Sequence, residues 1–261
     1  MPERPHPHPI PLSEALTIID RVDSVAPRDV ELSQAFGFAL ATDAGVAGTL
    51  RLAGARVRRI DIALLASQGI ARLSVRAPHL LVSHGAAEAS VAVLIGGAIT
   101  AEGGIVKIAE TASEASQRSA YDAVIGIGTE PALADPVFTG VSLKPGGAIA
   151  FGYAVGQPTL ILPAGFEAFA GWLAVGRRLL SRLAFRLIEE QPFLLELARP
   201  IASMRGVAEI VPVRRRAAQV EPIFGDAWSP QGLARSDGWI LVPAESEGLA
   251  AGSRVQMRPW P

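Results

Sequence analysis

The sequence predicts an α/β fold: an open, mostly parallel sheet with helices on both faces, preceded by an N-terminal helical piece and followed by a small all-β domain. Two observations predict it. From about residue 78, short apolar strands alternate with helical stretches, as in parallel sheets whose crossovers are helices. After residue 192, helical periodicity gives way to short strands separated by Pro, Gly and Asp turns. The 261 residues, 49% of them hydrophobic, are enough to build these parts around full cores.

The N-terminal piece is predicted to span residues 1–59 as a tail, helices and a connector. The first eleven residues are rich in proline and have no apolar stretch of the kind found in a signal peptide. Leu12, Leu16 and Ile19 share one face of a predicted helix over residues 12–22. A short strand at 30–32, a helical segment at 34–41 and a glycine- and arginine-rich connector at 45–59 follow.

The α/β domain is predicted to span residues 60–192. Its strands are expected at 79–83, 105–109, 121–125, 148–151 and 159–162, and its helices at 60–68, 87–101, 111–119 and 166–189. The last helix has an apolar stripe on one face. Arg178, Arg182 and Arg186 form a four-spaced row on another face, which favours exposure to solvent over an anion-binding track.

The C-terminal domain is predicted to span residues 193–261. Four strands are expected, at 207–213, 217–223, 239–242 and 254–257.

Composition excludes several classes of function. The formal net charge of −1 lacks the basic excess of a sequence-independent nucleic-acid binder, so no nucleic-acid partner is expected. The absence of cysteine excludes disulfides and thiolate chemistry, and it fits a cytoplasmic protein. The longest nearly apolar run, residues 91–101, is too short to cross a bilayer and predicts buried core rather than a membrane segment.

Three predicted loops leave the carboxyl ends of strands, where open α/β sheets bind ligands. They are Ser83-His84-Gly85, Gly126 to Glu130, and Pro163-Ala-Gly165. A further glycine turn carries Lys144, one of only two lysines against 22 arginines. Glycines allow close backbone approach and a lysine supplies a compact positive charge, so these loops could enclose an anion. A surface turn with an incidental charge is the alternative.

Other catalytic signatures are missing. Gly126-Ile-Gly128 lacks the third glycine of a dinucleotide-binding fingerprint, and the chain has no phosphate-binding P-loop. It also has no Gly-x-Ser-x-Gly nucleophile elbow. His84 is the only histidine on a candidate loop, and a structural hydrogen bond explains it more simply than general-base duty.

Four blocks, in order, resemble the molybdopterin molybdenumtransferase family (MoeA and the gephyrin E-domain). The first is Leu32-Ser-Gln-Ala-Phe-Gly-Phe-Ala-Leu-Ala-Thr-Asp43, and the second runs from Leu64 to Gly85. The third, Gly140-Val-Ser-Leu-Lys-Pro-Gly-Gly-Ala-Ile-Ala-Phe-Gly152 with Leu162-Pro-Ala-Gly165, resembles the family's "K-P-G-K-P … F-G … L-P-G-N-P" signature. The fourth is Gly232 to Pro243 with Ala251-Gly252.

The resemblance implies a molybdopterin-binding-like α/β domain with a small C-terminal β-barrel, usually in a homodimer. The family inserts molybdate into adenylylated molybdopterin and releases AMP with the help of a divalent cation. By resemblance, Lys144 and Asp135 take the catalytic positions, and Asp135 and Glu130 the metal positions for Mg²⁺. The cofactor-binding positions fall on Gly128, Thr129, Glu130, Pro145, Gly146, Gly147, Pro163 and Gly165.

Departures from the family pattern fall on the groups that hold metal and molybdate. The signature's second lysine is Gly147, and Asp135 lies near, not at, the family's acidic position. The short connector at 45–59 leaves no room for the family's inserted second domain. An oxyanion site with one lysine in place of two loses electrostatic stabilisation.

Three functions therefore stay open. The first is a reduced molybdopterin-binding accessory or scaffold protein that serves a molybdoenzyme or another protein of cofactor biosynthesis, with weakened or lost catalysis. The second is a minimal active molybdenumtransferase. The third is a pseudo-enzyme that keeps the fold as an interaction module without ligand.

Overall fold

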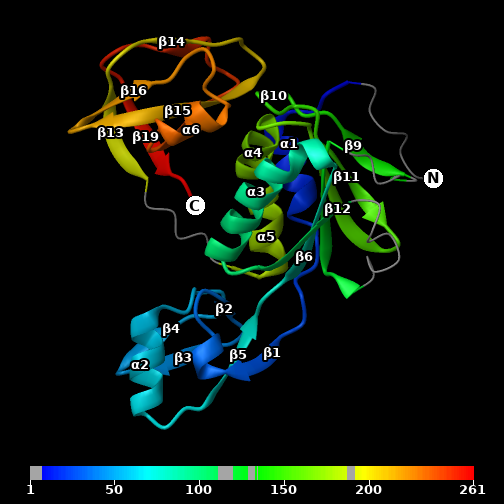
Figure 1. Ribbon diagram of the computed structural model, residues 1–261. Helices are drawn as coiled ribbons and strands as arrows, with labels where there is room; N and C mark the ends of the chain where they lie inside the picture. Colours follow the sequence, from blue (N-terminus) through cyan, green and yellow to red (C-terminus); the bar gives the residue numbers. More distant parts are fainter. Residues whose placement is uncertain (1–7, 111–119, 129–132, 134, 187–191) are drawn as a thin grey trace.

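A computed structural model describes the chain except residues 1–7, 111–119, 129–132, 134 and 187–191. Figure 1 shows three parts: a central α/β domain, a small N-terminal unit in blue and cyan, and a C-terminal barrel in yellow to red. The predicted fold class is confirmed: the fold is mixed α/β, with a sheet that contains parallel strands and a closed five-stranded barrel near the C-terminus.

The central sheet has six strands in the order β7-β6-β8-β12-β11-β9. Four neighbours are parallel: β7 (Ile105–Glu110), β6 (His79–His84), β8 (Ala123–Ile127) and β12 (Gln157–Leu162). The last two, β11 (Ala150–Ala154) and β9 (Pro136–Thr139), are antiparallel additions. Every residue of β8 is buried, as expected for a central parallel strand covered on both faces.

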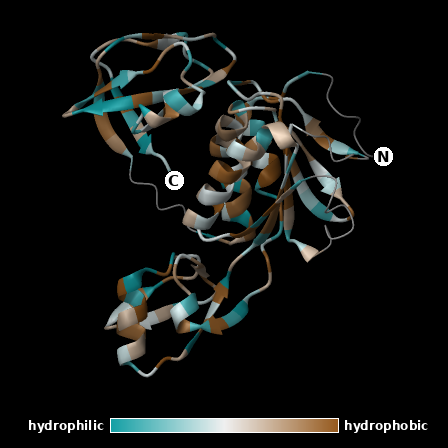
Figure 2. Ribbon diagram, in the orientation of Figure 1, coloured by the Kyte–Doolittle hydropathy of each residue, from teal (hydrophilic) through white to brown (hydrophobic). Residues whose placement is uncertain are grey.

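The described helices of this domain pack against one another beside the sheet (Figure 1). A 3₁₀ turn η2 (Ala86–Glu88) leads into α3 (Ala89–Ala101), which contacts β6, β7 and α4. The N-terminal helix α1 (Leu12–Ile19) packs on α5, so the predicted N-terminal helix joins the α/β core. Figure 2 shows hydrophobic residues concentrated on these helices and strands.

The predicted long helix is divided and ends early. It consists of α4 (Glu167–Gly171), a π-helical segment η5 (Trp172–Gly176) and α5 (Arg177–Leu183). The predicted end at residue 189 is wrong: Ala184 caps the helix and Phe185 follows with φ of 49°, outside the helical region. The helix predicted at 111–119 lies outside the described residues.

The arginine row on this helix is not a solvated face, so that prediction is wrong. Arg178 forms an ion pair with Asp20, and its Nη2 lies 2.8 Å from a carboxylate oxygen. Arg182 donates to the carbonyl of Val22 (3.0 Å), and Arg186 donates to the carbonyl of Glu102. Arg178 and Arg182 therefore attach the N-terminal segment to α5, and Arg186, just beyond the end of α5, contacts the residue that caps α3.

Residues 28–76 form a small unit with its own core (Figure 1). Strands β1 (Arg28–Glu31) and β2 (Ala39–Leu40) flank β5 (Arg72–Arg76), all antiparallel. A hairpin of β3 (Ala44–Val46) and β4 (Thr49–Arg51) and the helix α2 (Arg59–Ser67) complete it. The proposed boundary at residue 60 falls inside this unit, because β5 pairs with β1 and β2.

Two predictions within this unit are wrong. Residues 34–41 form no helix: a 3₁₀ turn η1 (Leu32–Gln34) precedes Gly37, whose φ of 87° breaks the segment. Residues 45–59 are more than the predicted connector, because they contain most of the β3–β4 hairpin and place Ala55 and Val57 in the core. In both segments, the apolar residues are buried against other parts of the chain, and this packing determines the local structure.

The C-terminal barrel contains the strands β15 (Ala208–Arg216), β16 (Gln219–Pro222), β13 (Phe193–Leu197), β19 (Arg254–Pro259) and β17 (Gly238–Val242). The pairing of β15 with β17 closes it. Strand β10 (Leu143–Lys144) of the central domain pairs with β15. A short helix α6 (Pro230–Ala234) and the pair β14 (Ile201–Ala202) and β18 (Gly248–Leu249) complete the domain. Sequence reasoning missed β13.

In the described part of the chain, no helix combines the length and the apolar character needed to span a bilayer.

Candidate functional site

Three loops meet at the carboxyl edge of the parallel strands, as predicted. His84, Ile127 and Leu162 lie opposite one another at the ends of β6, β8 and β12. The amide of Gly128 donates to the carbonyl of Leu162 (3.0 Å), which joins the second loop to the third. Pro163 follows directly, so these loop residues lie side by side.

Both the backbone conformation and the close neighbours of residue 128 require a glycine at this position. Its φ is +62°, and a Cβ there would lie 3.2 Å from Cβ of Ala164 and 3.2 Å from Oε1 of Glu88. The side chain of Glu88, on η2, therefore lies against the backbone of the second loop. The sequence analysis did not select Glu88. An acidic residue in the first turn after a predicted buried parallel strand is the feature that could have identified it. A carboxylate here disfavours a bound phosphate and favours a cation.

The other residues of these loops are placed as follows. His84 is buried, and its Nδ1 lies 2.8 Å from the carbonyl of Gly85, in keeping with a structural hydrogen bond. Gly165 has a φ of +69° and open space where a Cβ would stand. Thr129 and Glu130 lie outside the described residues.

The glycines of the Lys144 turn are packed against backbone. Gly146 has a φ of +87°, and a Cβ there would lie 2.7 Å from the carbonyl oxygen of Glu167 at the start of α4. A Cβ on Gly147 would lie 2.6 Å from the carbonyl oxygens of Val141 and Leu143. Pro145, between Lys144 and these glycines, follows a cis peptide bond. Close packing of the turn therefore requires both glycines even without a ligand.

Lys144 has an internal partner. Its Nζ lies 3.1 Å from Oε1 of Glu209 on β15, and its side chain is 62% exposed. The other carboxylate oxygen of Glu209 accepts a hydrogen bond from Ser203 (2.7 Å). The lysine therefore links the α/β domain to the barrel. The ammonium group is exposed, whereas the Glu209 side chain is only 14% exposed. Because the ammonium group faces solvent, an anionic ligand can compete for it.

Asp135 is not brought to this edge. It precedes β9, and Pro136 is level with Gly152, Thr159 and Val124 across the sheet. Four residues along β8 and three strand spacings separate that position from Gly128, about 20 Å at about 3.3 Å per residue and about 4.8 Å per strand. The end of β9, at Thr139, is the end that lies level with Gly126. Antiparallel β9 and β11 thus place Asp135 toward the amino edge.

A magnesium site is not assembled by the described residues. Within those ranges, no group of three or more His, Asp or Glu side chains is close enough to hold a metal ion. Mg²⁺ needs one or two carboxylates beside phosphate oxygens. Asp135 is at the other end of the sheet, and Glu130 is not described. Glu88 stands at the carboxyl edge beside Gly128, and Glu110, the last residue of β7, is level with His84 at the same edge.

Comparison with known proteins identifies similar sequences and folds. Residues 195–260 match the family model described as the MoeA C-terminal region (domain IV). No curated protein matches the chain in a sequence search.

Solved structures match nearly the whole chain. A molybdenum cofactor biosynthesis protein from Pyrococcus furiosus is 19% identical with a TM-score of 0.81, over 97% of this chain and 100% of that one. Two structures of the molybdopterin biosynthesis MoeA protein from Pyrococcus horikoshii are 14% and 16% identical, with TM-scores of 0.82 and 0.75 and the same coverage. At these identities the likeness establishes a shared fold.

Proposed function

We propose that this chain, which is MoeA-like in the sequence of its C-terminal domain and in fold over nearly its whole length, binds a molybdopterin-related ligand. It acts as an accessory or scaffold protein in molybdenum cofactor biosynthesis or delivery, with weakened or lost catalysis. The observation that carries the proposal is the retention of the whole fold around a site that keeps one lysine and does not assemble a carboxylate cluster from its described residues.

Ligand binding is assigned to the carboxyl edge and the Lys144 turn. The open space at Gly165 and the exposed ammonium of Lys144 support it. A lysine binds phosphate as a point charge on a flexible stem, and here it must leave Glu209 to do so. Gly128 and Pro163 lie at the carboxyl edge, and Pro145, Gly146 and Gly147 shape the turn that carries the lysine.

Loss of catalysis is inferred from charge. Stabilising a developing negative charge needs donors or cations aimed at it. Gly147 supplies no side chain where the family signature has a second lysine, and Asp135 is about 20 Å from Gly128 by the spacing of strands and residues. The carboxylate of Glu88 opposes negative charge at this edge.

One experiment separates binding from catalysis. The purified chain is mixed with molybdopterin or its adenylylated form, and binding is measured by calorimetry. Molybdate and Mg²⁺ are then added, and AMP is quantified. Binding without AMP release is the expected result, and failure of both ligands to bind contradicts the proposal.

Variants locate the ligand. Lys144→Ala is expected to weaken binding by at least fivefold, whereas Lys107→Ala, which removes the chain's other lysine on edge strand β7, leaves the affinity unchanged. Glu209→Gln keeps a hydrogen-bonding group but releases the ammonium of Lys144. Because Lys144 then no longer has to leave a carboxylate to reach the ligand, binding should tighten. If all three variants bind the ligand with equal affinity, the ligand does not bind at this turn.

A second candidate, a minimal active molybdenumtransferase, is favoured by one observation: Glu88 places a carboxylate beside Gly128, where a cation could bridge it to a phosphate. AMP release that Glu88→Gln abolishes would support it and overturn the scaffold proposal. A chain that binds no ligand fits the third candidate, an interaction module.

Cytoplasmic location, a homodimer and a molybdoenzyme partner complete the proposal. Sedimentation equilibrium tests the dimer, and a monomer at micromolar concentration contradicts it.

A further inference from the structure

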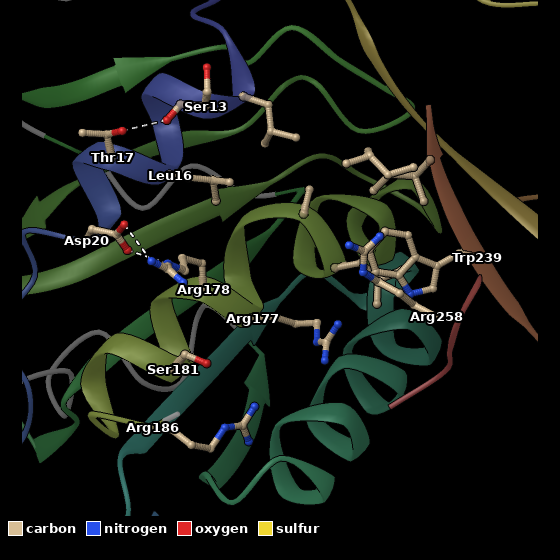
Figure 3. A pocket seen from close by; sticks show the side chains of 15 residues that line it. Ser13, Leu16, Thr17, Asp20, Arg177, Arg178, Ser181, Arg186, Trp239 and Arg258 are labelled. Carbon is tan, nitrogen blue, oxygen red and sulfur yellow. Dashed lines mark hydrogen bonds and ion pairs between the residues drawn. The ribbon is translucent and has the colours of Figure 1, made fainter. Parts of the chain in front are cut away.

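Two short crossings of the chain join the unit of residues 28–76 to the α/β domain (Figure 1). Upstream of the first crossing, Asp20 pairs with Arg178 (Figure 3), and the amide of Val25 donates to the last residue of α5. The segment that leads into the unit is therefore fixed on α5. The second crossing passes through Ala77, between β5 and β6. A movement of the unit relative to the α/β domain therefore has its hinges just after Val25 and around Ala77.

A hydrogen bond between Arg28 and His79 connects the two crossings. Arg28 is the first residue of β1, His79 is the first residue of β6, and both are half-buried. Nη1 of Arg28 lies 2.6 Å from Nε2 of His79. The guanidinium carbon of Arg28 also lies 5.8 Å from the ring centre of Phe38, and its Nε is buried without a hydrogen-bond partner among the described residues. The contact with His79 therefore ties the start of the unit to the start of the central strand β6.

The chemistry of this pair fixes the protonation state of His79. An arginine side chain offers N–H donors and no acceptor. Nε2 of His79 must therefore accept the hydrogen bond, which requires a neutral ring with its proton on Nδ1. A proton on Nε2 would set two donors and two positive charges against each other. The bond to Arg28 exists only while His79 is neutral.

A carboxylate also lies close to His79. The amide of His79 donates to Oδ2 of Asp122, just before β8, at 2.7 Å. On the other neighbouring strand, β7, the residue level with His79 is the uncharged Ile105. A protonated ring is attracted by the carboxylate of Asp122 and repelled by the guanidinium of Arg28. Both forces draw the imidazolium away from β1.

We propose that His79 makes the position of residues 28–76 depend on pH. In its neutral form it accepts from Arg28 and holds the unit as it stands in Figure 1. In its protonated form it releases Arg28, and the unit turns more freely about the two hinges. Histidine is the side chain whose charge changes between about pH 8 and pH 5. His79 is at the amino end of β6 and His84 at its carboxyl end, so this switch is separate from the candidate ligand site. The inference does not depend on the proposed function.

The test measures the distance between the unit and the α/β domain by double electron–electron resonance on the whole chain. The chain has no cysteine, so Ala63→Cys on α2 and Ser90→Cys on α3, both at exposed positions, place one spin label on each side of the hinges. Dilution with unlabelled chain restricts the signal to distances within one molecule. We expect one narrow distribution at pH 8. At pH 5.5, the fraction of molecules outside that distribution should rise at least threefold, and identical distributions at the two pH values would overturn the proposal.

Variants in the labelled chain assign the response to this pair. His79→Gln supplies an amide oxygen that accepts at every pH, so its distribution should stay narrow at pH 5.5. His8→Gln, at an exposed position of the N-terminal tail, should keep the full response. Arg28→Met removes the donor, so it should show at pH 8 the broad distribution that the wild type shows at pH 5.5. Circular dichroism checks that each variant is folded. A pH response that persists in His79→Gln, or a distribution of Arg28→Met at pH 8 as narrow as that of the wild type, would refute the assignment.

Discussion

Gly146→Ala tests whether the glycine turn is built for packing or for ligand approach. The native φ of +87° is a left-handed conformation, which costs an L-residue about 1–2 kcal/mol. The new Cβ would also lie 2.7 Å from the carbonyl oxygen of Glu167 and 3.1 Å from the amide nitrogen of Gly171. Both are backbone atoms of α4, so relief requires the helix or the turn to move, and overpacking of this kind costs about 1–3 kcal/mol. The expected loss of stability is about 2–5 kcal/mol, the sum of both ranges.

Gly165→Ala is the matched control, because it shares the left-handed conformation without the close contact. Its φ is +69° and nothing lies within 4 Å of the added Cβ, so only the conformational cost of about 1–2 kcal/mol applies. Urea denaturation followed by circular dichroism measures both variants, and the shift in midpoint at common slope gives the difference. Gly146→Ala should be less stable than Gly165→Ala by about 1–3 kcal/mol. Equal stabilities, with ligand binding lost only in Gly146→Ala, would refute the packing argument.

Two further predictions concern the helices that carry the arginine row. The hydrogen bond from Arg178 lowers the pKa of Asp20, so this pair stabilises the fold above about pH 4 and the contribution is lost as the pH falls further. Asp20→Asn should lower the free energy of unfolding by at most about 1 kcal/mol at pH 7, because both side chains of the pair are about one-third exposed. Below pH 4, the thermal midpoint of the variant should converge on that of the wild type. A difference in midpoint that stays constant with pH would contradict the assignment. Gly176→Ala would place a Cβ 2.2 Å from the ring of buried Trp172, so it should destabilise by about 1–3 kcal/mol. Gly97→Ala, in open helix surface, should instead be neutral or stabilising by up to about 1 kcal/mol in the same denaturation assay.

Elements with strong local patterns were predictable. The strand predicted at 79–83 is β6, and the helix predicted at 87–101 contains α3, because unbroken apolar runs and helical periodicity are properties of the segment itself. Segments that depend on distant partners were not. β2 and the β3–β4 hairpin exist because β5 and α2, later in the chain, complete their core. The local sequence pattern alone predicted a helix at residues 34–41 and a connector at residues 45–59.

The arginine row shows the same limit. A four-spaced row of charges is typical of a solvated helix face. Here, however, each guanidinium has a partner on the N-terminal segment or on Glu102, the residue that caps α3. The partners lie more than 80 residues away in the chain. No pattern within the helix contains that information.

The sequence by itself determined the class of fold, the loops that leave the carboxyl ends of β6, β8 and β12, and the turn that carries Lys144, because each depends on local pattern. Only the tertiary structure decided which charges stand together. The antiparallel register of β9 and β11 carries Asp135 away from the carboxyl edge, and packing of η2 brings Glu88 against Gly128. Pairing across domains couples Lys144 to Glu209. The physical reason is that strand direction and register set distances between residues, and both are fixed by long-range burial rather than by neighbours in the chain.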